Sequence, residues 1–314
     1  MLTLRSILCA VDFSDQSQEA LRWAVALAAQ HQSQLTVFTA VDPLLAQAAK
    51  ARFSLDLPAA ETAPALREFV KGVVLVHPSW TLDTGIDVRV GDAAELILDA
   101  ADRDRADLIV MGTQGLGGLR KLLLGSTTER VLRRTHTPLL AVPLVDAQMA
   151  VLDESGPRFD MKSILMATDF SEASAAAATW AADLAREISV PLVIAHVVTP
   201  ADVPPQWQSY VGDADAERAT LARKRLEELS AQLSGTPGCD TVVVVGRPAD
   251  AIATIAQERR AGLIVMGLSG HHGVLAPRPG SIAYRVLCLA QVPVLVVPPR
   301  AAAGEHDDHR RETT

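Results

Sequence analysis

The chain has 314 residues, enough for about two domains. Its hydrophobic content of 49% and charged content of 21% are typical of a globular protein with buried cores, and no apolar run approaches the roughly 18 residues of a membrane span. The net charge of −8 and the aromatic content of only 4% disfavour a nucleic-acid polymer as partner. A single anionic ligand stays open, because helix N-termini bind phosphate without basic side chains.

Short apolar runs alternate with helical patterns along the first half of the chain. Ser14 occupies an N-cap position ahead of an apolar stripe at helical spacing, on which Trp23 is interpreted as core packing. The capping box that begins at Asp92 opens a later helix. The pattern predicts strands at 5–12, 35–41, 107–111 and 138–143, and helices near 65–76 and at 126–134. Between Pro43 and Gly85, where four prolines occur, we expect a long mobile connection before the helix.

The second half repeats this order. Trp180 lies on the apolar stripe that follows Ser171, and it is also interpreted as core packing. Pro248 occupies the first turn of a further helix. The pattern predicts strands at 192–198, 241–245, 262–266 and 293–298, and helices at 214–231 and 281–289. Because strands alternate with helices, both halves are predicted to be α/β, with a parallel, doubly wound, Rossmann-like sheet.

Two sequence blocks occur twice. Residues 6–14 recur as 163–171, at an offset of 157, and residues 108–112 recur as 263–267, at an offset of 155. A period this long indicates duplicated domains, because solenoid repeats are much shorter. The predicted division is a domain at 1–146, a linker at 147–160, a second domain at 161–300 and a disordered tail at 301–314.

The three cysteines show neither a disulfide framework nor the spacing of a metal site. Cys9, Cys239 and Cys288 are interpreted as small buried hydrophobes in a reducing compartment. The N-terminus has no cleavage pattern of a signal peptide. The sequence therefore predicts a cytoplasmic protein.

A glycine pattern with a fixed spacing follows the fourth strand of each half. In the first half, Gly112 and Gly115 are followed nine residues later by Gly125, Ser126 and Thr127, which open a helix. Glycines allow the backbone to approach a ligand closely, and the N–H groups of a helix N-terminus favour phosphate. The pattern therefore predicts an anion site without a lysine. The alternative is that these are the turn and cap glycines of an ordinary strand-helix unit.

The second half keeps the spacing with Gly267, Gly270, Gly280 and Ser281, but it has Ile282 in the place of Thr127. The second site therefore loses one hydroxyl, worth about 1 kcal/mol or some fivefold in affinity. We expect the first site to be the tighter one, unless Arg278 or His271 compensates in the second.

The pattern Gly-x2-Gly-x9-Gly-Ser/Thr after a strand ending in Met-Gly, with an earlier strand ending in Asp-x-Ser and a final Val-Pro strand, resembles the ATP-binding universal stress proteins. The resemblance covers nearly the whole chain, twice. It implies two tandem domains, each with a five-stranded parallel sheet of order 3-2-1-4-5, and a ligand site between strands one and four.

The resemblance also implies the site residues. An acid near the ribose corresponds to Asp12 or Asp169, for which capping of the following helix is the alternative role. Backbone contact with the adenine edge corresponds to Ala40 or Val197, and neighbouring His196 is interpreted as structural. The phosphate cradles implied are Met111, Gly112, Gly115, Gly125, Ser126 and Thr127 in the first half, and Met266, Gly267, Gly270, Gly280, Ser281 and Ile282 in the second. Magnesium is implied only through ATP, and no catalytic or metal-binding residue is singled out.

The predicted function is an ATP-dependent regulatory protein of the stress response with little or no turnover, since neither half has the phosphate-loop pattern Gly-x4-Gly-Lys-Ser/Thr. A slow ATPase is one alternative, and a dimerisation module that has lost its ligand is another. The resemblance further implies that the last strands of the two halves pair within the chain, and it leaves open whether two chains form a homodimer.

Overall fold

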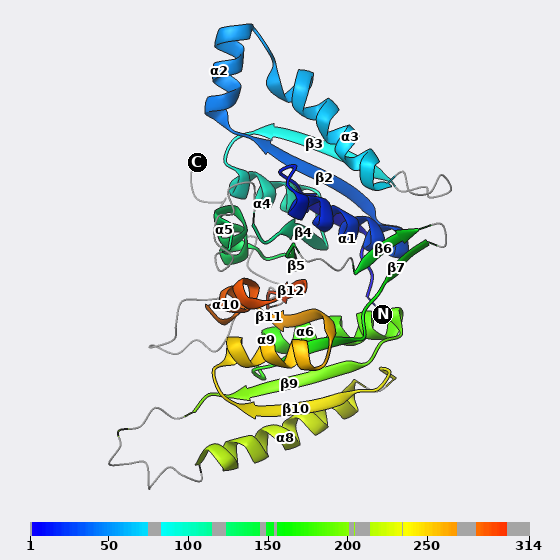
Figure 1. Cartoon of the computed structure of the whole chain (residues 1–314), viewed down its shortest axis with the longest axis vertical. Coiled ribbons are helices and arrows are strands. Elements are labelled where there is room, and N and C mark those ends of the chain that lie inside the picture. Colours follow the sequence, from blue (N-terminus) through cyan, green and yellow to red (C-terminus); the bar gives the residue numbers. More distant parts are fainter. Residues whose placement is uncertain are drawn as a thin grey trace, which may run out of the picture.

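The computed structural model describes residues 2–74, 83–114, 124–144, 149–153, 156–200, 204, 214–233, 235–268 and 281–299. These residues form two α/β units stacked along the long axis of the molecule (Figure 1). Gly115, Gly270 and Gly280, and the tail at 301–314, lie outside the described residues.

The first unit is a five-stranded parallel sheet of order β3-β2-β1-β4-β5. This confirms the predicted fold class and strand order. Its strands are β1 (Ser6–Ala10), β2 (Gln34–Val41), β3 (Thr84–Val90), β4 (Leu108–Gly112) and β5 (Leu139–Val142). Its helices are α1 (Asp15–His31), α2 (Pro43–Phe53), η1 (Pro58–Thr62, a π-helix), α3 (Ala63–Val74), α4 (Ala93–Arg103) and α5 (Ser126–Arg134).

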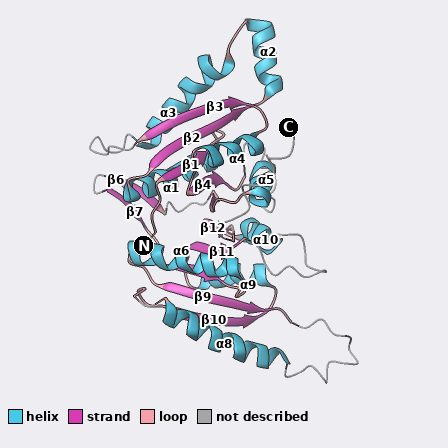
Figure 2. Ribbon diagram, turned by 180° about the vertical axis from the view of Figure 1, so that it is seen from behind, coloured by secondary structure: helices cyan, strands magenta, loops and turns pink. Residues whose placement is uncertain are grey.

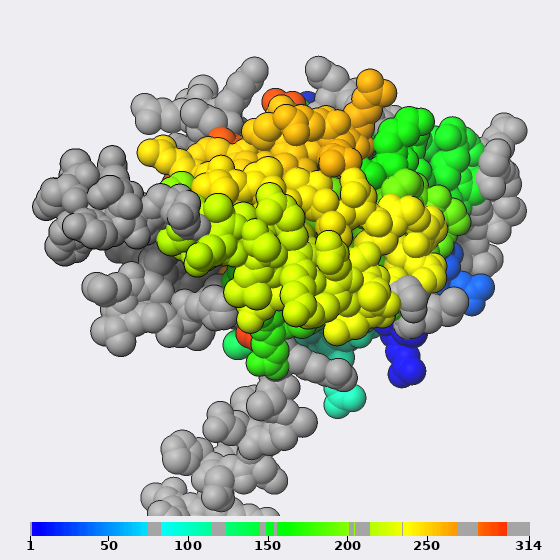
Figure 3. Space-filling view, turned by 90° about the horizontal axis from the view of Figure 1, so that it is seen from below, coloured from blue at the N-terminus to red at the C-terminus, as the bar shows by residue number. Residues whose placement is uncertain are grey.

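The second unit repeats the order as β10-β9-β8-β11-β12. Its strands are β8 (Ser163–Ala167), β9 (Leu192–Val198), β10 (Asp240–Val245), β11 (Ala261–Gly267) and β12 (Val294–Val297). Its helices are α6 (Glu172–Ile188), α8 (Ala214–Gln232), α9 (Pro248–Glu258) and α10 (Ser281–Leu289). Figure 2 shows the strands enclosed between helices on both faces, and Figure 3 shows the end of the molecule covered by α8 and the segments after it.

Helix boundaries follow the capping residues. Ser14 accepts a hydrogen bond from the Ser17 N–H at the start of α1, and Ser171 does the same for Ser174 at the start of α6. Asp92 caps α4 through the Glu95 N–H, as the capping box predicts. These side chains satisfy N–H groups that have no partner within the helix.

The expected long connection after residue 43 is wrong. Asp42 caps α2, Pro43 stands in its first turn, and Pro58 stands in the first turn of η1. Proline is compatible with a first turn, because the N–H it lacks would have no helical partner there. The expected helix near 65–76 is α3, which begins slightly earlier, at Ala63.

The predicted linker contains a β-hairpin, β6 (Ala150–Asp153) with β7 (Gly156–Phe159). The ring of Phe159 packs on the ring of Trp23 at 4.9 Å between centroids. Trp23 is 2% exposed, and Trp180 is half-buried against the same cluster. Both tryptophans therefore pack in the core, as predicted.

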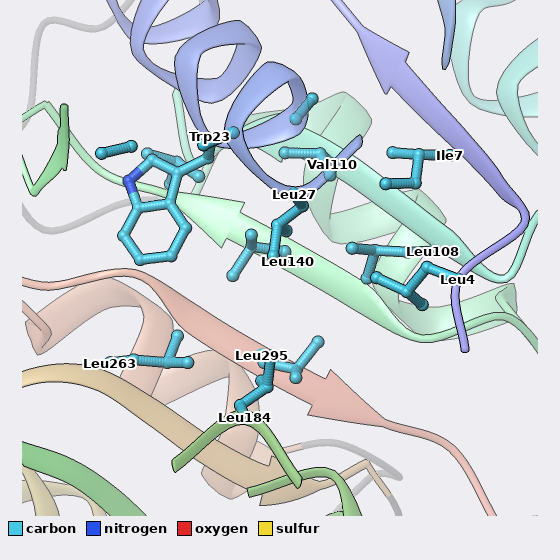
Figure 4. Close-up of a cluster of buried hydrophobic side chains, with 14 of the residues drawn as sticks. Leu4, Ile7, Trp23, Leu27, Leu108, Val110, Leu140, Leu184, Leu263 and Leu295 are labelled. Carbon is cyan, nitrogen blue, oxygen red and sulfur yellow. The ribbon is translucent and has the colours of Figure 1, made fainter. Parts of the chain in front are cut away.

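Strands β5 and β12 pair antiparallel and join the two sheets into a single ten-stranded sheet. Leu140 and Leu295 face each other in this register. Leu27 and Leu108 above, with Leu184 and Leu263 below, continue the apolar contact across the junction (Figure 4). Two apolar clusters, one on each face of the sheet, contain residues from both units.

Candidate functional site

The candidate site of each unit lies where the first and fourth strands end side by side. Strand β1 pairs with β4 up to Ala10 and Met111, and β8 pairs with β11 up to Ala167 and Met266. The chain leaves these strands toward helices on opposite faces of the sheet. A crevice at such a switch point is the usual ligand position in a doubly wound sheet.

Asp12 and Asp169 follow β1 and β8, where they hold a tight turn. The Asp12 carboxylate accepts hydrogen bonds from the Ser14 N–H at 3.1 Å and from the Ser14 hydroxyl at 2.5 Å. Asp169 accepts from the Ser171 N–H at 3.0 Å. In both turns the residue between is a phenylalanine in the left-handed region, Phe13 at φ 65° and Phe170 at φ 61°. Serine supplies the helix cap, so the aspartates fix the turn that precedes it.

Gly112 and Gly267 end strands β4 and β11 beneath the first turn of a helix. A Cβ on Gly267 would lie 2.7 Å from the carbonyl carbon of Ala173 and from the amide nitrogen of Ser174. A Cβ on Gly112 would meet the Cβ of Gln16 at 3.2 Å. The glycine identity at Gly267 is therefore required by close packing of α6, a role that the sequence did not indicate.

The N-terminus of α5 stands beside the tip of β4. Its N-cap is Gly125, whose N–H donates to the Thr113 carbonyl at 2.8 Å. Ser126 is exposed and Thr127 is half-buried. The buried hydroxyl of Thr128 donates to the Gly112 carbonyl at 2.8 Å. Two hydrogen bonds thus hold the start of α5 against the strand end, and Gly112, Gly125, Ser126 and Thr127 share this corner.

Sequence reasoning missed Thr128, although a third hydroxyl residue in the run from Ser126 indicated it. The second unit has Ala283 at the equivalent position, 2% exposed, preceded by Ile282, which is 39% exposed. The start of α10 therefore lacks both side-chain hydroxyls. For Ser281 the structure describes only the backbone, at the first position of α10.

Ala40 and Val197 lie near the ends of β2 and β9, half-buried and paired with Arg89 and Val244 of the next strand. The residues before them, Thr39 and His196, each bind a backbone carbonyl just after the first strand of their own domain. Thr39 donates its hydroxyl to the Val11 carbonyl at 2.8 Å.

At the equivalent position, His196 Nδ1 donates to the Thr168 carbonyl at 2.8 Å, because a carbonyl oxygen only accepts. The His196 ring also stacks on Phe170 at 4.6 Å between centroids. His196 thus has the structural partner that the sequence analysis favoured.

Across the residues that the structure describes, there is no group of three or more His, Cys, Asp or Glu side chains placed to hold a metal ion. Within the same residues, the helices are too short or too polar to cross a bilayer.

The model of the universal stress protein family matches residues 3–143 and again residues 161–298. A universal stress protein of Mycolicibacterium smegmatis is 28% identical over 299 residues, covering 94% of this chain and 97% of that protein. One from Methanocaldococcus jannaschii is 32% identical over 138 residues, covering 44% of this chain and 81% of that protein.

Solved structures agree on the fold. A universal stress protein from Archaeoglobus fulgidus superposes with a TM-score of 0.62 at 20% identity, covering 94% of this chain and 98% of that chain. The two family matches together cover nearly the whole described sheet. The chain belongs to the universal stress protein family, and it contains the family's domain twice.

Proposed function

We propose that each domain binds ATP or a related adenine nucleotide at the carboxyl end of its sheet, and that the chain is a nucleotide-dependent regulator of the stress response with little or no turnover. One observation carries the proposal. The N-terminus of α5 is held against the tip of β4, next to the turn at Asp12, by the bonds of Gly125 to Thr113 and of Thr128 to Gly112.

This corner suits the phosphate end of a nucleotide. The first N–H groups of a helix and its positive dipole end favour anions, and Ser126 and Thr127 add hydroxyl donors. Among the described residues of this corner, the donors are backbone and hydroxyl groups without a cationic clamp, which favours binding over fast phosphoryl transfer. Mg²⁺ would enter with ATP, since the described residues contain no acidic cluster of their own for it.

The remaining contacts rest on the resemblance to the family. Asp12 and Asp169 would lie near the ribose, and the backbone at Ala40 and Val197 would meet the adenine edge. Each aspartate follows the strand that pairs with the strand leading to the phosphate position of its own domain. This placement lets the nucleotide of a domain contact the aspartate and the phosphate position of that domain together.

The second site is proposed to be the weaker one. Ile282 and Ala283 stand where the first domain has Thr127 and Thr128. One lost neutral hydrogen bond corresponds to about 1 kcal/mol, or roughly fivefold in affinity. The exposed Ile282 side chain adds an apolar surface next to the phosphate position.

The nucleotide content of the purified protein tests the binding proposal. The protein is denatured, and ATP, ADP and AMP in the supernatant are counted per chain. ATP at one or two per chain supports a binding regulator. ADP or AMP alone supports the slow ATPase. A chain that carries none and ignores added ATP refutes the proposal and favours a dimerisation module.

A matched exchange of side chains tests the site assignment. Thr127→Ile gives the first site the residue of the second, and Ile282→Thr makes the reverse change. We expect Thr127→Ile to weaken one of the calorimetric ATP-binding steps about fivefold and Ile282→Thr to strengthen the other. Unchanged affinities in both variants would show that the starts of α5 and α10 do not bind the nucleotide.

We further propose that the domains, 1–146 and 161–300, stay paired in solution through β5 and β12 and that the chain works in the cytoplasm. The antiparallel register at Leu140 and Leu295 supports the pairing, since it covers two apolar strand edges. Free Cys9, Cys239 and Cys288 support a reducing compartment. Light scattering decides whether two chains associate as a homodimer.

A further inference from the structure

Side chains at the carboxyl-terminal ends of α1 and α6 meet across the junction of the two domains. The Nε2 atom of His31, in the last turn of α1, lies 3.3 Å from Oε1 of Glu187, in the last turn of α6. The His31 side chain is 7% exposed and the Glu187 side chain 27%. The two residues therefore form an ion pair between the domains when His31 is protonated.

The duplication does not generate this pair. At the offset of 157 residues, His31 corresponds to Ile188 and Glu187 corresponds to Gln30. The reverse combination, Gln30 with Ile188, carries no charge and cannot form an ion pair. Neither His31 nor Glu187 is therefore required by the fold that both domains share.

The contact depends on charge more than on hydrogen bonding. His31 Nε2 is buried and has no hydrogen-bond partner among the described residues, so the nearby Glu187 oxygen attracts it without hydrogen-bond geometry. A buried polar atom without a hydrogen bond costs stability. The end of α1 favours a cation, because the carboxyl-terminal end of a helix carries partial negative charge, and the end of α6 disfavours an anion for the same reason. A positive charge on His31 satisfies both ends.

An apolar region lies beside the pair. Ile188, directly after Glu187, lines a cavity of about 20 Å³ at the junction, together with Leu27, Leu184 and other apolar residues of both domains. Figure 4 shows Leu27 and Leu184 on the two sides of this junction. Apolar surroundings screen charges less than water does, so the attraction between His31 and Glu187 is stronger than that of a pair on an open surface.

Other titratable groups belong to the elements that pack against α1 and α6, or to the two helices themselves. They are Cys9 of β1, His196 of β9, exposed Arg67 of α3, Asp15 and Glu172 at the opposite helix ends, and the ion pairs Glu68–Lys71 of α3, Asp153–Arg158 of the hairpin, Glu19–Arg22 of α1 and Asp183–Arg186 of α6. Of these, Asp183 stands one turn before Glu187 and adds negative charge there. It increases the need for a cation at the end of α6.

We propose that His31 and Glu187 make the pairing of the two domains dependent on pH, with a firmer junction when His31 is charged and a weaker one when it is neutral. The inference does not depend on nucleotide binding, but it rests on the proposed pairing of the domains through β5 and β12. Helices α1 and α6 begin directly after the turns of Asp12 and Asp169. The pair thus joins the far ends of the two helices that start beside the candidate sites.

The sign of the pH dependence follows from the two groups. Burial raises the pKa of the Glu187 carboxyl, and the charge of His31 acts in the opposite direction. A raised pKa in the folded chain means that stability is present at low pH and lost as the pH rises, because the Glu187 charge is costly to bury. Protonated His31 offsets this cost. Since histidine loses its charge between about pH 5 and 8, the junction should be weaker at about pH 8 than at about pH 6.

Amide hydrogen exchange of the ligand-free full chain measures this effect at the junction strands. His31→Gln is compared with the wild type at the same pH, because glutamine is uncharged and the comparison cancels the intrinsic exchange rate. At about pH 6 we expect peptides covering 139–142 and 294–297 to exchange about fivefold faster in His31→Gln. At about pH 8 the variant and the wild type should agree within about twofold.

A double-mutant cycle identifies the partner. Glu187→Gln should also accelerate exchange of the junction peptides at about pH 6, because it leaves the His31 charge buried and unpaired. The variant with both changes should exchange more slowly than the product of the two single effects, since each change removes the same interaction. His136→Gln is the matched control, because His136 is an exposed histidine of the first domain, and it should leave both peptides unchanged.

Three results would overturn the inference. Equal acceleration in His31→Gln at both pH values would mean lost packing, and a double variant that equals the product would mean two independent side chains. Equal acceleration of peptides covering 6–10 and 163–167, in the middle of each sheet, would mean general destabilisation.

The same measurement separates this inference from the proposed domain pairing. If peptides 139–142 and 294–297 are unprotected in the wild type at both pH values, the pairing itself is refuted and the inference with it. If they are protected and His31→Gln changes nothing at about pH 6, the pairing stands and only the role of His31 and Glu187 is refuted.

Discussion

Replacing Gly267 by alanine is expected to lower the free energy of unfolding by about 1–3 kcal/mol, the usual cost of overpacking. The new Cβ would lie 2.7 Å from two backbone atoms of α6 and 2.9 Å from the Ala173 Cβ. Backbone atoms in the first turn of a helix cannot rotate away, so α6 or the end of β11 must move. For a domain of about 150 residues, each kcal/mol lowers Tm by about 2–4 °C.

Two other glycines provide graded controls for this variant. At Gly112 the new Cβ would lie 3.2 Å from the Gln16 Cβ, so a small adjustment suffices and Gly112→Ala should cost less. At Gly85 in β3 nothing lies within 4 Å, and Gly85→Ala should be neutral or slightly stabilising. Differential scanning calorimetry and urea unfolding measure the series.

The relative Tm losses of the three variants test the packing argument. A Tm loss for Gly267→Ala no larger than that for Gly112→Ala would refute the packing argument. If Gly267→Ala keeps its stability and loses only nucleotide, the glycine serves the ligand, which is the interpretation that the sequence favoured. If Gly267→Ala lowers the unfolding stability, glycine is needed at this strand end for the stability of the fold.

Three further outcomes are expected. Thr128→Val should lower the free energy of unfolding by about 1 kcal/mol, because the Gly112 carbonyl loses its hydroxyl donor, and unchanged urea midpoints would contradict this. Ser171→Ala should cost about 1 kcal/mol through loss of the α6 cap, measured by calorimetry. Burial raises the pKa of Glu19, so the folded chain binds this proton more tightly than the unfolded chain. The stability that Glu19 contributes to the fold is therefore fully present below about pH 4.3 and is lost as the pH rises through the raised pKa. Glu19→Gln should remove this pH-dependent loss. If the urea stabilities of the wild-type chain and of Glu19→Gln change in parallel from pH 4 to 8, the argument is refuted.

The strand order was implied by the resemblance to the family, whereas most helix starts could be predicted from the residues because they depend on local chemistry. Ser14 and Asp92 stand directly before an apolar helical stripe, and a side-chain cap is worth about 1 kcal/mol at such a position. The duplicated Met-Gly strand ends marked β4 and β11. The helix α2 was missed, since the four prolines from Pro43 onward led us to expect a mobile connection, although Asp42 makes Pro43 a first-turn residue.

The candidate site was predictable only in part. The sequence indicated that Gly267 was special, but its reason is a contact with Ala173 and Ser174, nearly a hundred residues earlier in the chain. The two halves also make one equivalent contact with different side chains. Thr39 and His196 each bind the carbonyl of a residue just after the first strand, and a comparison of the halves by residue identity shows only a mismatch.

What the two halves keep and what they change have different physical causes. The turn of Asp12 and Phe13 recurs as Asp169 and Phe170, with the same left-handed phenylalanine, because both halves must bring a helix back over a parallel strand. Such features are required by the fold in each domain.

The first turns of α5 and α10 carry no such requirement, and there the halves diverge. The first domain has Thr127, Thr128 and Glu129 where the second has Ile282, Ala283 and Tyr284. The Thr128 hydroxyl binds the Gly112 carbonyl in the first domain, and the second domain has an alanine at the equivalent position. This difference supports the proposal that the first domain has the tighter nucleotide site.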